Sequence, residues 1–245
     1  MKQNNWFDPF YVQSHLSEEE IKIQKNVSNF CNKELRPSVI EMNKNHYFDK
    51  NLYPKFGALG VLGQTIKSHG GSGTSNLAYG LVAYEFEKVD SSYRSSISVQ
   101  SSLVIHPISE FGSNKQKDKY LPELINGKKI GCFGLTESEA GSDPSSMKTT
   151  FKKTKDGYIL NGSKNWITNA PIADVFIIWA VEENKDHKSI QGFILEKNFT
   201  GLKTSIIENK TSLKISPTGQ IILNNVFVPN NLCLENTEGW KSVFS

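Results

Sequence analysis

Arginine and cysteine are scarce in this sequence. Only two of the 28 basic residues are arginine, and the rest are lysine. The three cysteines are spread widely along the chain, which suits neither a disulfide framework nor a paired-cysteine metal site. We therefore predict a reducing compartment, and we expect no bound metal. The scarce residues are Arg36, Arg94, Cys31, Cys132 and Cys233.

Patterns that would indicate a membrane anchor, an export signal or a nucleic-acid surface are also absent. No run approaches the roughly 18 apolar residues of a membrane span. Residues 1–14 show neither an apolar core nor the arginine-rich pattern of a transit peptide. The net charge of +3 comes from interspersed lysine and glutamate. We expect a cytoplasmic protein, or a mitochondrial matrix one if the source is eukaryotic, without nucleic-acid or integral membrane contact.

Most short motifs that mark an enzyme class are missing. The chain has no GxxxxGK[ST] phosphate loop, no GxGxxG between a strand and a helix, no HExxH metal site and no GxSxG nucleophile. The five histidines are scattered. Gly70–Gly73 is rich in glycine, but no preceding strand and no following lysine support phosphate binding. We interpret that segment as a plain loop.

The front half of the chain is predicted to be helical. Ser17 and Glu20 form a capping box, because a serine hydroxyl and a glutamate three residues later can satisfy each other's free backbone amides. Apolar residues follow at helical spacing, and Pro37 interrupts the pattern. Further helices are expected around the glycines at positions 57–63, and over 76–90, 91–111 and 115–124.

From Ile130 onward the pattern changes to β-branched and aromatic runs separated by turn residues, which is typical of strands. Asp156–Gly157 predicts a tight hairpin, because glycine accepts a positive φ. No low-complexity linker separates the halves. We therefore predict an α+β protein, in which an all-helical N-terminal domain packs against an antiparallel β-barrel or β-sandwich domain. The β runs cover 131–137, 147–154, 157–169, 174–181, 190–197, 202–210 and 220–229.

Two segments of the β half are the best candidates for chemistry. The first is Phe133–Glu137, which leads into Gly141–Asp143, and the second is Asn161–Asn169. Their glycine, hydroxyl and backbone amide groups can hydrogen-bond a phosphate or the edge of a planar ligand. Taken alone, Trp166 in the second segment is more often a core residue than a wall of a cofactor site, and the first segment is more often a structural loop.

Together, the two segments resemble the acyl-CoA dehydrogenase family, whose β domain carries a Leu-Thr-Glu loop, a Gly-Ser-Asp turn and a Trp-Ile-Thr strand. The similarity extends over residues 6–235 and is strongest to glutaryl-CoA dehydrogenases. It implies FAD as the cofactor, with Trp166 covering the flavin near its reactive nitrogen. The residues implied to bind the cofactor are Phe133, Gly134, Leu135, Thr136, Gly141, Ser142, Trp166, Ile167 and Thr168.

Arg94 is the candidate for substrate recognition. A planar guanidinium binds a carboxylate through two parallel hydrogen bonds, which lysine cannot do. The resemblance places Arg94 where glutaryl-CoA dehydrogenases hold the far carboxylate of glutaryl-CoA. From the residues alone, a surface ion pair of Arg94 with Glu87 or Asp90 is the simpler interpretation. The residues implied to bind substrate are Glu87, Arg94, Ser95, Ser98 and Ser142.

The resemblance implies oxidative decarboxylation of glutaryl-CoA to crotonyl-CoA and CO2, with electrons passed to an electron-transfer flavoprotein, in a homotetramer. The family's catalytic glutamate lies in a C-terminal four-helix domain without a counterpart here. The base is therefore expected beyond Ser245, and this chain alone is expected to be inactive. The expected domains are 1–127 (helical), 128–238 (flavin and acyl-CoA binding) and 239–245 (the start of the absent domain).

Two other functions stay open from the sequence. One is a dehydrogenase for an uncharged short-chain acyl-CoA. The other is a non-catalytic module that binds flavin or acyl-CoA without redox turnover.

Overall fold

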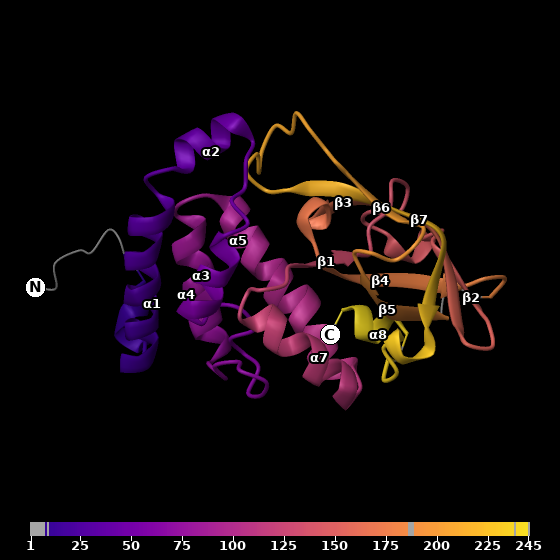
Figure 1. Cartoon of the computed structure of the whole chain (residues 1–245). Helices are drawn as coiled ribbons and strands as arrows, with labels where there is room; N and C mark the ends of the chain where they lie inside the picture. The colour runs from indigo at the N-terminus through magenta and orange to yellow at the C-terminus, as the bar shows by residue number, and fades with distance from the viewer. Residues whose placement is uncertain (1–7, 9, 186–188, 238, 245) are drawn as a thin grey trace, which may run out of the picture.

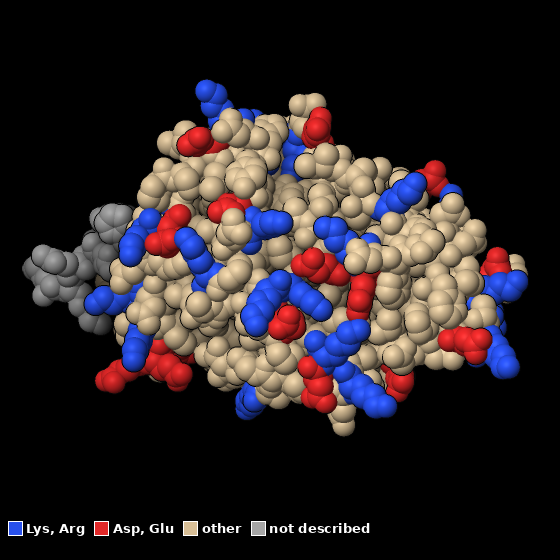
Figure 2. Space-filling model, in the orientation of Figure 1, with Lys and Arg blue, Asp and Glu red and all other residues tan. Residues whose placement is uncertain are grey.

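Apart from the short C-terminal helix α8 (Trp240–Val243), which lies beside the sheet, helices and strands occupy two sides of the molecule in chain order (Figure 1). The computed structural model describes residues 8, 10–185, 189–237 and 239–244. The helical half, indigo to magenta, packs side by side with the sheet, orange to yellow. This arrangement confirms the predicted α+β fold, with a helical part followed by a β part. On the face shown in Figure 2, positive and negative side chains are interspersed over both halves.

The first helix begins where the sequence satisfies its free amide groups. Helix α1 (Glu18–Phe30) follows Ser17, whose hydroxyl accepts from the Glu20 amide while the Glu20 carboxylate accepts from the Ser17 amide. The predicted capping box is therefore confirmed. A π-helical turn over Cys31–Leu35 extends the helix, and Pro37 lies in the turn that follows it.

A long helical run crosses the middle of the helical half. Residues 91–111 form one continuous run, in which a π-helical segment (Val99–Ile105) separates α5 from α6. Within the described ranges, no helix has the length and apolar character needed to cross a membrane. The other helices are α2 (Val39–Asn45), α3 (Leu52–Leu59), α4 (Asn76–Glu87), α5 (Ser91–Ser98), α6 (His106–Phe111), α7 (Asn114–Ile125) and α8 (Trp240–Val243).

The β half is a curled, mixed sheet rather than a purely antiparallel one. Its strand order is β1-β4-β2-β3-β7-β6. Strand β5 lies off this path and pairs with β4. Strands β1 and β2 both pair with β4 in parallel, and the remaining pairs are antiparallel. The strands are β1 (Gly131–Gly134), β2 (Thr150–Lys153), β3 (Gly157–Thr168), β4 (Val175–Glu182), β5 (Ile190–Glu196), β6 (Leu202–Ile206) and β7 (Thr218–Pro229).

The predicted hairpin joins β2 to β3, but its glycine has a different role. The Thr154 amide donates to the Gly157 carbonyl at 2.8 Å, so Lys155 and Asp156 form the loop. Gly157 already belongs to β3 and is not among the glycines with positive φ. A Cβ there would lie 2.3 Å from the Val228 carbonyl oxygen. Glycine is needed because β3 and β7 approach closely, not because the turn requires it.

A buried glutamine joins the helical half to the sheet. Gln100 lies in the π-helical segment and is fully buried. Its amide nitrogen donates to the carbonyls of Leu124 and Lys129, both at 2.9 Å, and its oxygen accepts from the Gly131 amide at 2.8 Å. The end of α7 and the start of β1 are thereby held on the same side chain.

Replacing Gln100 with methionine should destabilise the fold strongly. Gln100→Met keeps the length of the side chain but leaves two carbonyls and one amide without this partner in a dry interior. We expect the free energy of unfolding in urea to fall by about 3 kcal/mol. The matched control, Gln220→Met on the exposed face of β7, should change it by less than about 0.5 kcal/mol. Equal effects of the two substitutions would contradict this role.

Candidate functional site

The two segments singled out in the sequence meet at neighbouring strand ends. The first runs from the end of β1 into the loop after it, and the second covers the later part of β3 and Asn169. The Asn165 amide donates to the Thr136 carbonyl at 2.9 Å, and the Asn165 side-chain nitrogen donates to the Ser138 hydroxyl at 3.2 Å. The fold therefore brings together two groups of predicted site residues that are about 30 positions apart in the chain.

Trp166 is a surface residue held on an unusual backbone. Its φ is +61°, in the left-handed region that bulky residues rarely adopt. The pairing of β3 with β7 shifts register between Lys164 and Ile167, so Trp166 lies on a β-bulge, a feature that commonly re-aims a side chain. The residue is 58% exposed, so the interpretation of Trp166 as a core residue is wrong.

The neighbouring site residues divide into exposed and packed positions. Ile167 is buried and pairs with Gly219 of β7, whereas Thr168 is half-buried. Gly134 is buried as well, and a Cβ there would lie 2.6 Å from the Ile178 Cδ1 atom. The glycine is thus explained by packing inside the sheet. The half-buried side chains of the first segment are Phe133, Leu135 and Thr136.

The loop after β1 carries exposed polar groups. Gly141 and Ser142 are exposed, and the loop turns where the Glu137 amide donates to the Ala140 carbonyl at 3.1 Å. Asp143 accepts from the Ser145 amide at 3.1 Å and so starts a short 3-10 turn. Exposed backbone amides and hydroxyls in such a loop are suited to bind a phosphate or a polar chain.

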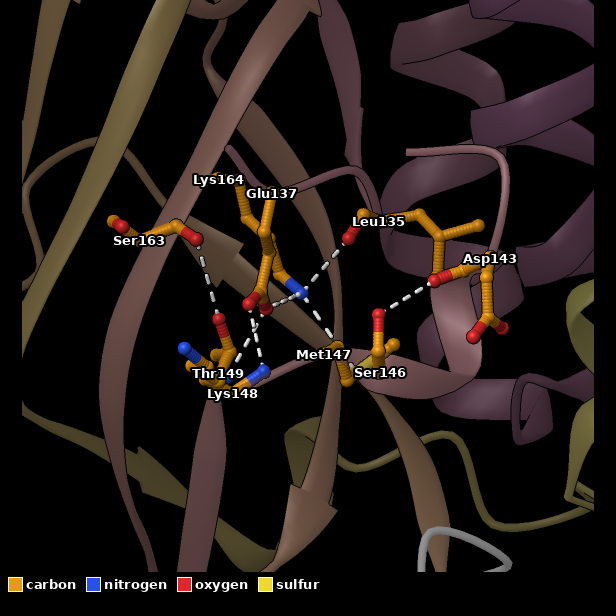
Figure 3. A network of polar contacts seen from close by, with 9 residues as sticks. All are labelled: Leu135, Glu137, Asp143, Ser146, Met147, Lys148, Thr149, Ser163 and Lys164. Atoms are coloured by element: carbon orange, nitrogen blue, oxygen red, sulfur yellow. Dashed lines mark hydrogen bonds and ion pairs between the residues drawn. The ribbon is translucent and has the colours of Figure 1, made fainter. Parts of the chain in front are cut away.

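A buried ion pair lies beneath this loop (Figure 3). The Lys164 Nζ atom is 2.8 Å from Glu137 Oε1 and 3.0 Å from the Leu135 carbonyl oxygen. The Lys164 side chain is fully buried and that of Glu137 nearly so. In this arrangement Glu137 serves as the buried counter-charge of Lys164.

Sequence reasoning did not identify Lys164, although a signal was present. Side chains alternate between the two faces of a strand. Leu160 is buried against the core of the sheet. Lys164 lies four residues further along β3, so its side chain points to the same, inward face. A lysine at an inward position requires a buried counter-charge. The search for that partner would have led to the acidic residues of the loop.

Glu137 also closes the loop at its far end. Its carboxylate accepts from the Lys148 amide at 2.7 Å and from the Thr149 amide at 3.0 Å. Burial alone would raise the pKa of Glu137, but the Lys164 charge and these hydrogen bonds outweigh it and hold the pKa below its usual 4.5. Burial lowers the pKa of Lys164 to about 8, against the opposing effect of Glu137. Both groups are therefore charged at neutral pH.

Replacing Glu137 with glutamine should give a stability loss that depends on pH. At neutral pH we expect Glu137→Gln to cost about 3 kcal/mol, because Lys164 loses its counter-charge. The pKa of Glu137 is lowered in the folded state, so its contribution is complete above the usual value of 4.5 and is lost as the pH falls through the folded-state pKa. The difference from the unmodified protein should therefore shrink in acid.

Urea unfolding at neutral and acidic pH measures this difference. Glu139→Gln is the matched control, because Glu139 lies in the same loop and pairs with Lys148 at the exposed surface. It should change the free energy of unfolding far less than Glu137→Gln does, because exposed ion pairs contribute little. A Glu137→Gln difference that stays constant from neutral pH to acid would contradict the assignment.

Arg94 and Glu87 form an ion pair on adjoining helices. Arg94 Nε donates to Glu87 Oε2 at 2.8 Å, and the Ser91 hydroxyl donates to the same carboxylate. These bonds lower the pKa of Glu87, with Ser91 the larger cause. The contact agrees both with a surface ion pair and with a glutamate that orients a substrate-binding arginine. Ser95 and Ser98 are half-buried on the same helix, α5.

Comparison with known proteins assigns the two halves to one family. The model of the acyl-CoA dehydrogenase N-terminal domain matches residues 17–128, and the model of the acyl-CoA dehydrogenase middle domain matches residues 132–226. The helical half and the curled mixed sheet of this chain thus correspond to the N-terminal and middle domains of acyl-CoA dehydrogenases. The chain belongs to the acyl-CoA dehydrogenase family.

Several relatives within this family are similar to the chain to nearly the same degree. A short-chain-specific acyl-CoA dehydrogenase of Megasphaera elsdenii is 37% identical, over 89% of this chain and 58% of its own length. A glutaryl-CoA dehydrogenase of Desulfococcus multivorans is 36% identical, with coverages of 94% and 61%. The crystal structure of a glutaryl-CoA dehydrogenase from Mycobacterium smegmatis in complex with FADH2 has a TM-score of 0.92 and 37% identity, with coverages of 96% and 60%.

The chain therefore spans about 60% of the length of these three relatives. Sequence identity also does not separate the glutaryl-CoA enzymes from the short-chain enzymes.

Proposed function

We propose that the chain is the flavin- and acyl-CoA-binding part of an FAD-dependent acyl-CoA dehydrogenase. The observation that carries this proposal is Trp166, a large apolar residue that is 58% exposed on a left-handed backbone. A left-handed backbone at a bulky residue costs free energy, and such strained positions cluster at functional sites. Contact with the flat face of a flavin would cover the ring and so account for its position.

The surrounding residues suit the other parts of FAD. The Thr136 amide and hydroxyl would hydrogen-bond the ring edge, together with the backbone of Phe133–Leu135. The exposed Gly141 and Ser142 would hold the phosphates or the pantetheine chain of the substrate. Ile167 and Thr168 would contribute from the strand that carries Trp166. The structure of the M. smegmatis relative contains FADH2, which supports a flavin site on this fold.

For the substrate we propose glutaryl-CoA. The bond from Arg94 to Glu87 uses Nε. The two terminal nitrogens of the guanidinium form the fork that a second carboxylate requires. Ser95 and Ser98, one and four residues further along α5, would add hydrogen bonds. A dehydrogenase for an uncharged short-chain acyl-CoA is the alternative, which the similarity to the M. elsdenii enzyme favours.

In this function the chain positions the cofactor and the substrate. Bound FAD supplies a hydride acceptor for the substrate β-carbon. Trp166 excludes water from that side, and Arg94 anchors the far carboxylate, which leaves as CO2 after oxidation to give crotonyl-CoA. No residue of this chain is assigned to remove the α-proton, and we expect that base beyond Ser245. We further propose residues 1–127 and 128–238 as the two domains, and 239–245 as the beginning of a third.

For the whole protein we propose an electron-transfer flavoprotein as the electron acceptor, because reduced flavin must be reoxidised for turnover. A homotetramer, and a cytoplasmic or mitochondrial matrix location, complete the proposal.

Flavin binding and reduction test the proposed activity. We expect the protein to quench the fluorescence of added FAD. Anaerobic glutaryl-CoA should bleach the visible flavin absorption of a form extended beyond Ser245, but not that of the 245-residue chain. Bleaching by the chain itself would show that it contains the base. Flavin binding without bleaching in either form would favour the non-catalytic binding module, and no flavin binding by either form would contradict the proposal.

Arg94→Lys tests the choice of substrate. The substitution keeps the charge but removes the planar fork, so the preference for glutaryl-CoA over butyryl-CoA should fall about tenfold in the extended form. The ratio of kcat/KM for the two substrates measures this preference. Arg36→Lys is the matched control, because it alters the other arginine, which bonds Asn32 on the first helical run. An unchanged ratio in Arg94→Lys would favour the uncharged substrate.

A further inference from the structure

Lys164 cannot contact a ligand, because its hydrogen bonds are used inside the protein. Its Nζ atom donates to Glu137 Oε1 at 2.8 Å and to the Leu135 carbonyl at 3.0 Å, and it lies 3.9 Å from the Met147 sulfur. Its side chain is 0% exposed. Figure 3 shows the ammonium group between the Glu137 carboxylate and the Leu135 backbone. Any effect of Lys164 on the site must therefore act through these neighbours.

One of these neighbours belongs to the candidate flavin site. Leu135 and Thr136 share a peptide bond, and none of the described peptide bonds is cis. In a trans peptide the C=O and the N–H point in opposite directions. Lys164 holds the Leu135 carbonyl toward the interior. The Thr136 amide hydrogen is consequently turned away from the interior, toward the outer side of the loop.

The other half of Thr136 is held from β3. Its carbonyl accepts from the Asn165 amide, the residue directly after Lys164. Two consecutive residues of β3 therefore hold two consecutive carbonyls of the loop, at Leu135 and Thr136. With both flanking carbonyls held, the Thr136 amide has little freedom to rotate.

A buried lysine is an expensive way to stabilise a fold. Desolvation of the two charges offsets most of their attraction, and a well-packed apolar pair is often at least as stable. An apolar side chain at position 164 would, however, donate nothing to the Leu135 carbonyl. The presence of a lysine at this inward position is therefore better explained by the donor it supplies than by stability.

We propose that Lys164 is a positioning residue for flavin binding: it holds the Leu135 carbonyl inward and so directs the Thr136 amide outward to the edge of the flavin ring. Glu137 supplies the counter-charge for the buried ammonium group, and a glutamine at this position would keep an oxygen that can accept from it. This inference rests on the proposed function, since it assumes that FAD occupies the loop.

Two substitutions in the pair separate positioning from stability. Lys164→Met and Glu137→Gln both break the ion pair, but only Lys164→Met removes the donor to Leu135. We expect Lys164→Met to raise the Kd for FAD about tenfold, the equivalent of about 1.4 kcal/mol, and to shift the visible absorption bands of the bound flavin. Glu137→Gln should raise the Kd less than about threefold. Lys148→Met, which removes an exposed lysine of the same loop, should leave it unchanged.

A second readout does not need the flavin. The carbonyl 13C chemical shift of Leu135, measured without FAD, should move in Lys164→Met and stay in place in Lys148→Met. If Lys164→Met does not fold, the double variant Glu137→Gln/Lys164→Met takes its place, because it leaves no unpaired buried charge. Its Kd for FAD, flavin spectrum and Leu135 carbonyl shift are then compared with those of Glu137→Gln.

The outcomes distinguish this inference from the proposed function. Failure of the unmodified protein to bind FAD, in both the given and the extended form, would contradict the proposed function and the inference with it. FAD binding by the unmodified protein with the same Kd and spectrum in Lys164→Met would overturn the inference alone. Equal weakening by Lys164→Met and Glu137→Gln would also overturn it, because the effect would then follow the loss of the ion pair.

Discussion

The Glu137–Lys164 ion pair is the constraint on which the geometry of the candidate site depends. One carboxylate binds an ammonium group from β3 and two amides at the far end of the loop, while the ammonium group binds a carbonyl at the near end. Charged hydrogen bonds in a dry interior are strong and directional. The loop is exposed along most of its length, but the buried ion pair holds its backbone at Leu135 and at Lys148 and Thr149.

A second set of buried polar contacts fixes the helical half against this site. Gln100 and Asn169 both bond the first residue of β1, through its amide and its carbonyl respectively. The run of helix that contains Gln100 is the same one that begins with α5 and Arg94. The candidate flavin segment and the helix that carries Arg94 are thus joined through the hydrogen bond between Gln100 and Gly131.

Local signals in the sequence predicted the helices well, because capping and proline act over a few residues. The Ser17–Glu20 box and Pro37 mark a helix start and a break that the structure contains. Strand pairing depends on residues far apart, so the parallel pairing of β1 and β2 with β4 could not be read from runs of β-branched residues. The exposure of Trp166 was equally hidden, because a bulge interrupts the alternation on which such a prediction rests. Only the family resemblance, and not the periodicity, predicted that Trp166 is available to a ligand.

The left-handed backbone at Trp166 also bears on how such a protein can be engineered or can evolve. Glycine adopts that conformation without penalty, so exchange of the tryptophan for glycine would relieve strain and remove an exposed apolar surface at once. Selection for thermal resistance alone would consequently favour losing the indole. If Trp166 binds the flavin as proposed, stability and ligand recognition would make opposite demands on the residue at this position.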